Sequence, residues 1–332
     1  MIAIVLFIAG LGLLVAGAEM VVRGASSVAV LLGISPMVIG LTIVSVGTSA
    51  PELAVGIVAA STDNGGLAVG NIAGTNVLNL LFILGLSALL RPLPLHLQIF
   101  KLELPMIVLA AGLMTVLAWD GRLSRLDGAV MLAAGIGYTL ALLHLTRQSA
   151  KRSKAQQEEL KEFEEEYGPQ SVAAPPPGWR ARLWYGLLLL GGIAITVLGA
   201  ELLVRGAADI ARALGVSNMI IGLTIVAVGT SAPELVTTIL STLKNDRDVA
   251  VGNLLGSSIY NILIILSITC IVAPRGLPVE RDLLLFDIPL MAGVALGAIP
   301  VFITGKRISQ WEGGLGVAIY VSYMVWLILA RT

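Results

Sequence analysis

Two glutamates stand inside apolar stretches of this 332-residue chain, each after a run of Gly, Thr, Ser, Ala and Pro. Glu52 lies in "GLTIVSVGTSAPEL" (residues 40–53) and Glu234 in "GLTIVAVGTSAPEL" (residues 222–235), which agree at thirteen of fourteen positions. A carboxylate near the centre of a membrane helix costs about 2.5 to 3.5 kcal/mol on insertion scales. Two at matching positions predict a function. Cation binding is favoured over a structural ion pair, because neither motif has a Lys or Arg nearby.

Each glutamate follows a proline that should interrupt its helix. Pro51 cannot donate a backbone hydrogen bond, and its ring pushes against the carbonyl of Gly47, four residues earlier. The break should free backbone oxygens, which membrane proteins tolerate where the backbone is buried or faces water. The polar side chains of each motif lie three and four positions apart, on one helix face beside the break. They are Thr48, Ser49 and Glu52 in the first motif and Thr230, Ser231 and Glu234 in the second.

More oxygens follow in "GNIAGTNVLN" (70–79) and "GNLLGSSIYN" (252–261). Thr75 with Asn79, and Ser257 with Asn261, are four residues apart and share a helix face. The glycines of both stretches have GxxxG spacing, which lets a helix approach its neighbour closely. We interpret the four polar residues as ligands and the glycines as packing devices, while interhelical hydrogen bonding by the same side chains remains the alternative.

Over both halves the set holds two carboxylates, two amides, six hydroxyls and the freed carbonyls, without His or Cys. Calcium takes about six to eight such oxygen ligands, whereas transition metals favour imidazole or thiolate. Magnesium fits less well because it demands tight octahedral geometry and loses water reluctantly. Sodium, another hard cation, could use the same atoms. The sequence predicts a calcium and sodium site and no resident cofactor.

The composition indicates an integral membrane protein, with 57% hydrophobic and 13% charged residues and a mean hydropathy of +0.92. Its apolar stretches are continuous and near the ~20 residues that cross a bilayer as a helix, so the predicted fold is all-α. We count ten, and interpret the first as a retained helix rather than a signal peptide. They are 2–22, 36–60, 67–90, 103–118, 127–146, 183–204, 218–243, 249–273, 283–303 and 311–330.

An internal duplication sets the predicted topology. Residues 40–79 and 222–261 align without a gap and agree at 20 of 40 positions. The predicted units are a five-helix repeat over 1–146, a polar linker over 147–182 and a second repeat over 183–332. Five is odd, so the second repeat enters from the opposite side if the linker does not cross. Inverted repeats with interrupted helices at the midplane are the build of secondary transporters.

Basic residues orient the chain. With the linker inside, 14 of the 21 Lys and Arg fall on the cytoplasmic side, as the positive-inside rule prefers. We therefore predict a multi-pass plasma-membrane protein, or an inner-membrane protein if bacterial, with both termini outside. One chain supplies both halves of the site, so we expect a functional monomer. Its partners would be calcium, sodium and the lipid bilayer, with no nucleic acid.

The duplicated motifs resemble the α-repeats of the sodium/calcium exchangers, within the cation/calcium antiporter superfamily. The likeness covers both repeats and all ten helices. It implies sodium/calcium exchange by alternating access, in which the first and sixth helices move against a fixed core. Their small residues, "AGLGLLVAGAE" and "LGGIAITVLGAE", would give surfaces that slide.

The resemblance also implies roles for individual residues. The central calcium ligands would be the carboxylates of Glu52 and Glu234 with the carbonyls of Thr48 and Thr230. The flanking sodium ligands would be Ser49, Ser231, Thr75, Ser257 and the carbonyls of Ser45 and Ala227. Asn79 and Asn261 would complete the middle of the site. An acid at the position of Asn261 goes with potassium dependence in one branch of the family, so its absence here argues against potassium.

The sequence is also compatible with other functions, although not equally with each of them. A calcium/proton antiporter could use the same glutamates as proton acceptors, and sodium dependence separates the two. A passive channel would show currents without countertransport. An intramembrane hydrolase would need a nucleophile with a base, or a metal with His ligands. The duplicated stretches 40–79 and 222–261 contain neither His nor Cys, and the chain has no GxSxG or HExxH, so we expect no enzyme.

The remaining polar residues have ordinary structural interpretations. Glu19 with Arg23, and Glu201 with Arg205, have i, i+4 spacing and predict ion pairs. His96 and His144 are predicted to be interfacial or structural, Cys270 to be a packing residue, and the acidic stretch "EELKEFEEEYG" to be a solvated face of the linker.

Overall fold

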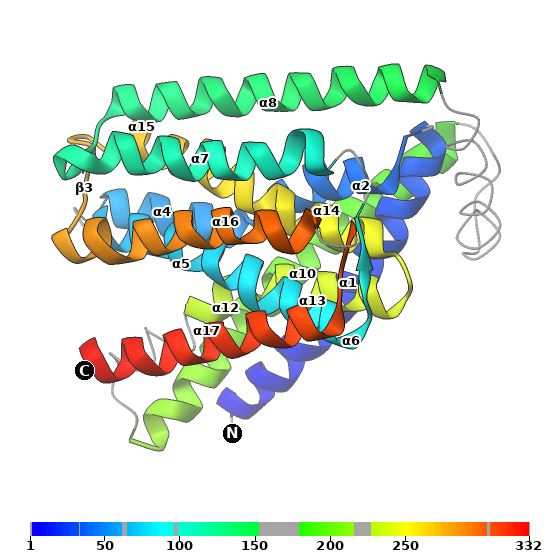
Figure 1. The fold of residues 1–332 in the computed structure, drawn as a ribbon. Coiled ribbons are helices and arrows are strands. Elements are labelled where there is room, and N and C mark those ends of the chain that lie inside the picture. The colour runs from blue at the N-terminus through cyan, green and yellow to red at the C-terminus, as the bar shows by residue number, and fades with distance from the viewer. Residues whose placement is uncertain are drawn as a thin grey trace.

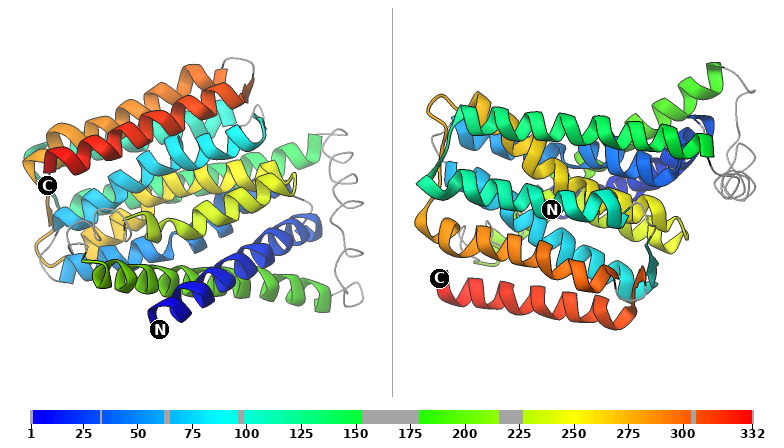
Figure 2. Two further views of the ribbon diagram at one scale, coloured as in Figure 1. Left: turned by 90° about the horizontal axis from the view of Figure 1, so that it is seen from below. Right: turned by 45° about the horizontal axis from the view of Figure 1, so that its top comes forward.

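The structure is a computed structural model of the chain, and it describes residues 2–32, 34–61, 65–95, 99–152, 179–215, 227–303 and 306–331. It is an all-helical bundle in which most of the long helices run side by side, while α1 and α10 lie together along one side (Figures 1 and 2). The described residues contain seven helices long and apolar enough to cross a membrane, or eight with one bent pair. The all-helical membrane fold is therefore confirmed, and ten spans remain a prediction.

The first half of the chain begins with one long helix and continues through interrupted ones. Its α-helices are α1 (Ile2–Leu32), α2 (Pro36–Ile39), α3 (Ser45–Thr48), α4 (Ala50–Ser61), α5 (Gly65–Val77), α6 (Leu84–Leu90), α7 (Leu104–Leu117) and α8 (Arg125–Arg152). Wider π-helical turns join several of them, at Gly40–Val44, Leu78–Ile83 and Ile99–Glu103, and a 3₁₀ turn follows α7 at Ala118–Asp120.

The second half repeats this order. Its α-helices are α10 (Trp179–Ala213), α12 (Ala227–Thr230), α13 (Ala232–Leu243), α14 (Arg247–Tyr260), α15 (Ser267–Val272), α16 (Ile288–Ile303) and α17 (Gln310–Arg331). The π-helical turns lie at Asn261–Leu266 and Leu283–Asp287. Residues 218–226 of the expected seventh segment lie outside the described residues, so only its later part, α12 and α13, is described.

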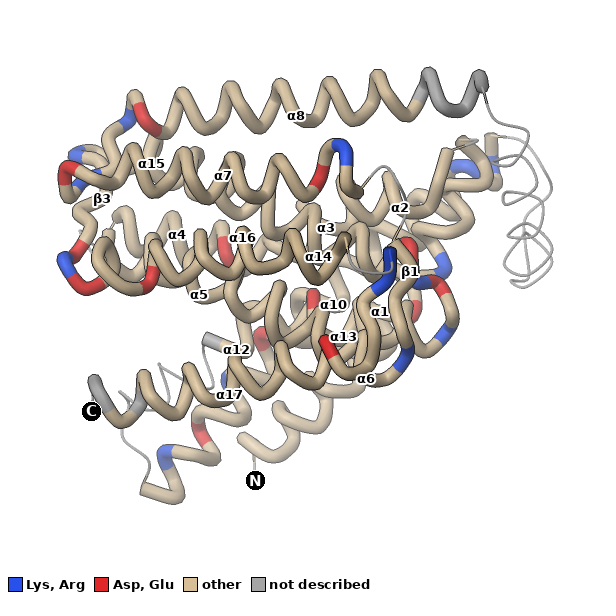
Figure 3. Tube along the Cα trace, viewed as in Figure 1, with Lys and Arg blue, Asp and Glu red and all other residues tan. Residues whose placement is uncertain are grey.

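Two short antiparallel ribbons, which the sequence did not predict, connect the halves. β1 (Leu93–Pro94) pairs with β4 (Arg307–Ile308), and β2 (Arg122–Leu123) pairs with β3 (Leu277–Pro278). Each ribbon thus joins one strand from each half. The ribbons lie at opposite ends of the bundle, with β3 at the left of Figure 1 and β1 at the right of Figure 3.

Burial follows the apolar pattern of the sequence. The long helices are almost free of charge through their middles, and Lys and Arg gather toward helix ends (Figure 3). The largest buried core spans both halves, from Met37 on α2 to Tyr320 on α17. Cys270 is fully buried in it on α15, which confirms its predicted packing role.

Glycine allows α1 and α10 to pack with their backbones in close contact. Glycines recur every seven residues on both helices, and a Cβ atom at any of them would clash with the opposite helix. At Gly17, for example, it would lie 2.5 Å from the backbone nitrogen of Thr196. The glycines are Gly10, Gly17 and Gly24 on α1, and Gly192, Gly199 and Gly206 on α10.

We predict that Gly17→Val destabilises the protein by about 1 to 3 kcal/mol, because the added methyl groups overpack the helix interface. The measurement is the midpoint of thermal unfolding in detergent, followed by tryptophan fluorescence. Gly12→Val on the same helix is the control, since nothing lies within 4 Å of a Cβ atom there. Equal effects of the two substitutions would contradict the close packing.

Candidate cation site between the two repeats

Each copy of the repeated motif interrupts its helix where the proline predicts. Between α3 and α4, Ser49 leaves helical geometry with φ −81° and ψ 12°. The segments on either side, Pro36–Thr48 and Ala50–Ser61, are bent by 40°. In the second half Ser231 takes nearly the same conformation between α12 and α13, with φ −90° and ψ 10°. The repeated sequence therefore gives a repeated break.

The two glutamates lie just after these breaks, in the first turns of α4 and α13, and neither is exposed. Each is bound by a serine of the other half. Ser49 Oγ donates to Glu234 Oε1 over 3.0 Å, and Ser231 Oγ donates to Glu52 Oε1 over 3.2 Å. Ser231 Oγ also lies 3.3 Å from Thr75 Oγ1 on α5. These reciprocal bonds bring both motifs into one site.

The site contains buried polar atoms that have no hydrogen-bond partner among the described residues. Within the described residues, Glu52 Oε2 and Glu234 Oε2 are buried without a hydrogen-bond partner. The same holds for both amide atoms of Asn79 and Asn261 and for Ser257 Oγ. A buried polar group without a partner costs about 1 to 3 kcal/mol, and more when charged. The five oxygens among these atoms are acceptors that a bound cation could satisfy, whereas the two amide nitrogens are donors.

The two asparagines occupy equivalent places on π-helical turns. Asn79 lies in Leu78–Ile83, and Asn261 begins Asn261–Leu266. Turns of this kind occur often at functional sites, since they displace side chains from the regular helical register. Both asparagines are fully buried.

The predicted set is thus buried as a group. Each member whose burial is described is at most 9% exposed. Ala227 begins α12, and only its backbone is described. The carbonyl of Ser45 accepts from the backbone N–H of Ser49 over 3.1 Å and from Thr48 Oγ1 over 3.4 Å, so it already has partners within its helix. Its proposed sodium contact would add to these.

Sequence reasoning missed Asn253 on α14. Its Oδ1 accepts from Thr48 Oγ1 over 3.2 Å, and its Nδ2 donates to Thr238 Oγ1 over 3.2 Å. It therefore holds the residue beside the first break against the second half. The available signal was identity between the repeats, since Asn71 stands at the matching position.

The GxxxG glycines of α14 bring that helix against the first motif. A Cβ atom at Gly252 would lie 2.5 Å from the carbonyl oxygen of Met37, and one at Gly256 would lie 2.2 Å from Ser45 Oγ. Their predicted packing role is confirmed here. The matching Gly70 and Gly74 of α5 instead line a cavity of about 560 Å³.

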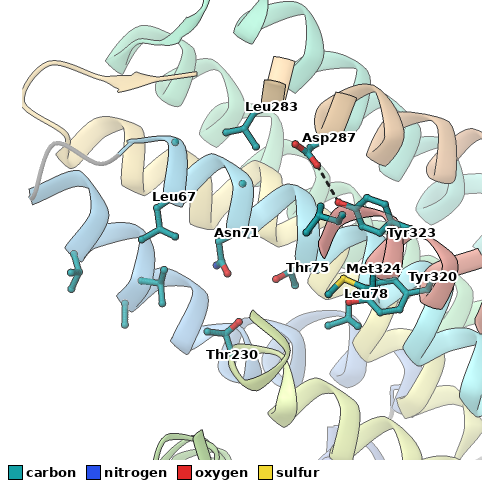
Figure 4. A pocket seen from close by; sticks show the side chains of 17 residues that line it. Leu67, Asn71, Thr75, Leu78, Thr230, Leu283, Asp287, Tyr320, Tyr323 and Met324 are labelled. Carbon is teal, nitrogen blue, oxygen red and sulfur yellow. Dashed lines mark hydrogen bonds between the residues drawn. The ribbon is translucent and has the colours of Figure 1, made fainter. Parts of the chain in front are cut away.

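This cavity reaches the candidate site. Asn71, Thr75 and Thr230 lie on its wall, and Asp287 accepts from Tyr323 Oη over 3.1 Å on another side (Figure 4). On α14 the equivalent glycines pack against residues 36–45 of the first half. The matching segment of the second half, residues 218–226, lies outside the described residues. The cavity therefore marks the face of α5 that corresponds to the covered face of α14.

The structure describes some of the other polar residues singled out in the sequence. The ion pairs Glu19–Arg23, at 2.5 Å, and Glu201–Arg205 are present. His144 is exposed on α8. His96 and the acidic stretch of the linker lie outside the described residues.

A model of the family described as "Sodium/calcium exchanger protein" matches residues 2–144 and 184–329. The chain belongs to the sodium/calcium exchanger family. The two matched segments correspond to the two halves of the fold. This is a family of transporters, so the chain is a membrane cation/calcium transporter and not an enzyme.

Relatives cover the chain almost from end to end. The putative antiporter CaxA of Alkalimonas amylolytica is 38% identical, over 97% of this chain and 98% of its own. The inner membrane protein YrbG of Escherichia coli is 34% identical, over 98% and 96%. The sodium/calcium exchanger MaX1 of Methanosarcina acetivorans is 31% identical over 95% of both chains.

The fold matches a solved exchanger of this family. A structure of the sodium-calcium exchanger NCX_Mj, soaked with sodium and calcium, superposes with a TM-score of 0.81. It is 28% identical, and the match covers 98% of this chain and 99% of that one.

We predict that Asn253→Ala lowers stability by about 1 to 3 kcal/mol, because the hydroxyls of Thr48 and Thr238 each lose a buried hydrogen bond to its amide. It should also weaken calcium binding, since Thr48 loses its anchor beside the site. Unfolding midpoints with and without calcium measure both effects. Ser258→Ala on the same helix is the control, because Ser258 Oγ donates to the carbonyl of Leu254 in its own helix, over 2.9 Å. An unchanged calcium-dependent stabilisation in Asn253→Ala would contradict the positioning role.

Proposed function

We propose that the chain is a secondary active antiporter that exchanges sodium for calcium across the membrane by alternating access. The observation that carries the proposal is the pair of fully buried carboxylates, Glu52 and Glu234, each bound on one oxygen by a serine of the other half. Each has its second oxygen buried without a hydrogen-bond partner among the described residues. Similarity to NCX_Mj and MaX1, which are named as sodium/calcium exchangers, supports the choice of ions.

Charge explains why the two ions would exclude each other. Two carboxylates in an apolar bundle need about two positive charges to offset their desolvation. One calcium supplies them, and so do two sodium ions. Occupancy by either would satisfy the site, and occupancy by both would leave excess charge. Countertransport follows from this exclusion when the site faces the two sides in turn.

The ligands divide into a centre and two flanks. Glu52 and Glu234, with the carbonyls of Thr48 and Thr230, would hold calcium, and the amides of Asn79 and Asn261 would complete the middle. The sodium ligands would be Ser49, Ser231, Thr75, Ser257 and the carbonyls of Ser45 and Ala227. The reciprocal serine bonds support this division, since both serines already lie at hydrogen-bond distance from the central carboxylates.

We further propose ten spans in two inverted five-helix repeats, 1–146 and 183–332, joined by the linker 147–182. The pairing of the four short strands, each with a strand of the other half, supports the inversion. A two-fold rotation that swaps the halves would carry the β1–β4 ribbon onto the β2–β3 ribbon, at the opposite end of the bundle. The halves then run in opposite directions through the membrane, as in many secondary transporters.

The proposed location is the plasma membrane, with the linker in the cytoplasm and both termini outside. The relative YrbG is named as an inner membrane protein. The excess of Lys and Arg on the linker side supports the orientation.

The direct test is uptake of radioactive calcium into sodium-loaded proteoliposomes diluted into sodium-free buffer. We expect uptake that needs internal sodium. Glu52→Gln and Glu234→Gln should each slow it about a hundredfold or more, because removing one charge from a buried ionic site costs about 3 kcal/mol or more.

Glu201→Gln is the matched control, since Glu201 is an exposed member of an ion pair away from the site. Its uptake should equal that of the native protein. Uptake driven by a pH gradient and indifferent to sodium would replace sodium with protons as the coupling ion. Calcium flux without any countertransported ion would indicate a channel.

A further inference from the structure

One helix carries a buried hydroxyl face that its repeat-related helix lacks. After Glu234, α13 places four Thr and Ser residues within two turns, and none of them is exposed. After Glu52, the matching positions of α4 have no hydroxyl. The residues on α13 are Thr237, Thr238, Ser241 and Thr242, and those on α4 are Val55, Gly56, Ala59 and Ala60. The duplication of the site therefore does not explain this hydroxyl face.

The hydroxyl face leads from the candidate site to one end of the bundle. Glu234, Thr238 and Ser241 are spaced four and three residues apart, so they follow one side of α13. The backbone N–H of Asp246 donates to the carbonyl of Ser241 over 2.8 Å, which places Asp246 directly beyond this face. The turn between α13 and α14 lies at the same end as the end of α8 and the start of α10, which flank the linker (Figure 1).

Two of the hydroxyls on this face have no hydrogen-bond partner in the part of the chain that the structure describes. Thr238 accepts from Asn253 Nδ2, and Thr242 Oγ1 donates to the carbonyl of Thr238 over 2.8 Å. Within the described residues, Thr237 Oγ1 and Ser241 Oγ are buried and have no hydrogen-bond partner. Buried hydroxyls in helices usually bond a carbonyl four residues earlier. These two leave their oxygens available to water or a cation.

The moving helix of the proposed mechanism is attached at the far end of this face. Ser26 Oγ on α1 donates to Asp246 Oδ2 over 2.6 Å, and both residues are buried. Nearby, Lys244 forms an ion pair with Glu19 of α1. On α10 the position that matches Ser26 is Ala208, which has no hydroxyl to donate. At this position α10 therefore cannot form the side-chain bond that α1 forms at the linker end.

We propose that the hydroxyl face of α13 and Asp246 form a cation path between Glu234 and the linker end, which α1 closes through Ser26. This inference rests on the proposed function and adds the route by which ions leave or reach the site on that side. Hydroxyl and carboxylate oxygens are the ligands that calcium and sodium prefer. The path binds these ions in transit with part of their water, since it offers few ligands at any one level.

Access of a charged reagent tests the path without requiring transport. The full chain with Cys270→Ala and Ser241→Cys is reconstituted in oriented vesicles. A membrane-impermeant cationic methanethiosulfonate is then added to one side or the other. We expect labelling from the linker side, slowed about tenfold by calcium. Ala59→Cys, at the matching buried position of α4, should stay unlabelled from that side. Thr237→Cys is a second reporter if Ser241→Cys does not fold.

Two further variants test closure by α1. Ser26→Ala should speed labelling of Ser241→Cys several-fold, because it removes the bond to Asp246. Ser27→Ala, the neighbouring buried hydroxyl without that bond, should leave the labelling rate unchanged. Equal rates in the two variants would overturn the closing role of Ser26.

The outcomes separate this path from the exchange activity. If reporters on α13 that still bind calcium are labelled no faster than Ala59→Cys, the path is wrong and sodium/calcium exchange stands. If they are labelled from the linker side while the native protein moves no calcium, the path stands and the proposed exchange fails. Replacing both free hydroxyls, with Thr237→Val and Ser241→Ala together, should slow exchange about tenfold and leave equilibrium calcium binding unchanged.

Discussion

The rest of the structure depends on the cost of burying two carboxylates in an apolar bundle. Glu52 and Glu234 are fully buried, and the groups that bind them are serine hydroxyls rather than basic side chains. A buried charge without a compensating partner is strongly destabilising. We propose that these two carboxylates take their partner from outside the protein, as a bound cation or as protons.

The helix breaks make this arrangement possible. A regular helix would use its carbonyls internally and direct its side chains to fixed faces, whereas the breaks at Ser49 and Ser231 start new helices directly before each glutamate. The reciprocal serine bonds then join the halves across the site. Close packing at Gly252 and Gly256 holds α14 against the first motif. Both α1 and α10 pack on each other along their glycines, and the proposed mechanism requires them to move relative to the site.

The sequence predicts the composition of the site better than its contacts. The repeated GTSAPE motif was enough to select Glu52, Glu234 and the serines, because proline, glycine and an acid at membrane depth have few other uses. It could not show that each serine bonds the glutamate of the other half, since that pairing depends on how the halves dock. Asn253 was missed for the same reason. Its bond to Thr48 joins residues 205 positions apart.

Some parts of the fold also could not be predicted from local patterns in the sequence. Apolar stretches predict long helices, but the π-helical turns at Asn79 and Asn261 leave no periodic signal, because their residues are as apolar as those of the neighbouring helices. The two ribbons involve strands of two residues, too short for alternation to indicate them. The two ribbons nevertheless follow the repeat, since β1 in the first half matches β3 in the second, and β2 matches β4.

The central claim is that one calcium or two sodium ions neutralise Glu52 and Glu234. Equilibrium binding of radioactive calcium to the purified protein, repeated over a range of sodium concentrations, tests it most directly. We expect one calcium per chain, with an apparent dissociation constant that rises about as the square of sodium concentration or more steeply, because at least two sodium ions must leave for each calcium. Calcium binding that is indifferent to sodium, or that persists when both glutamates are replaced by glutamine, would contradict it.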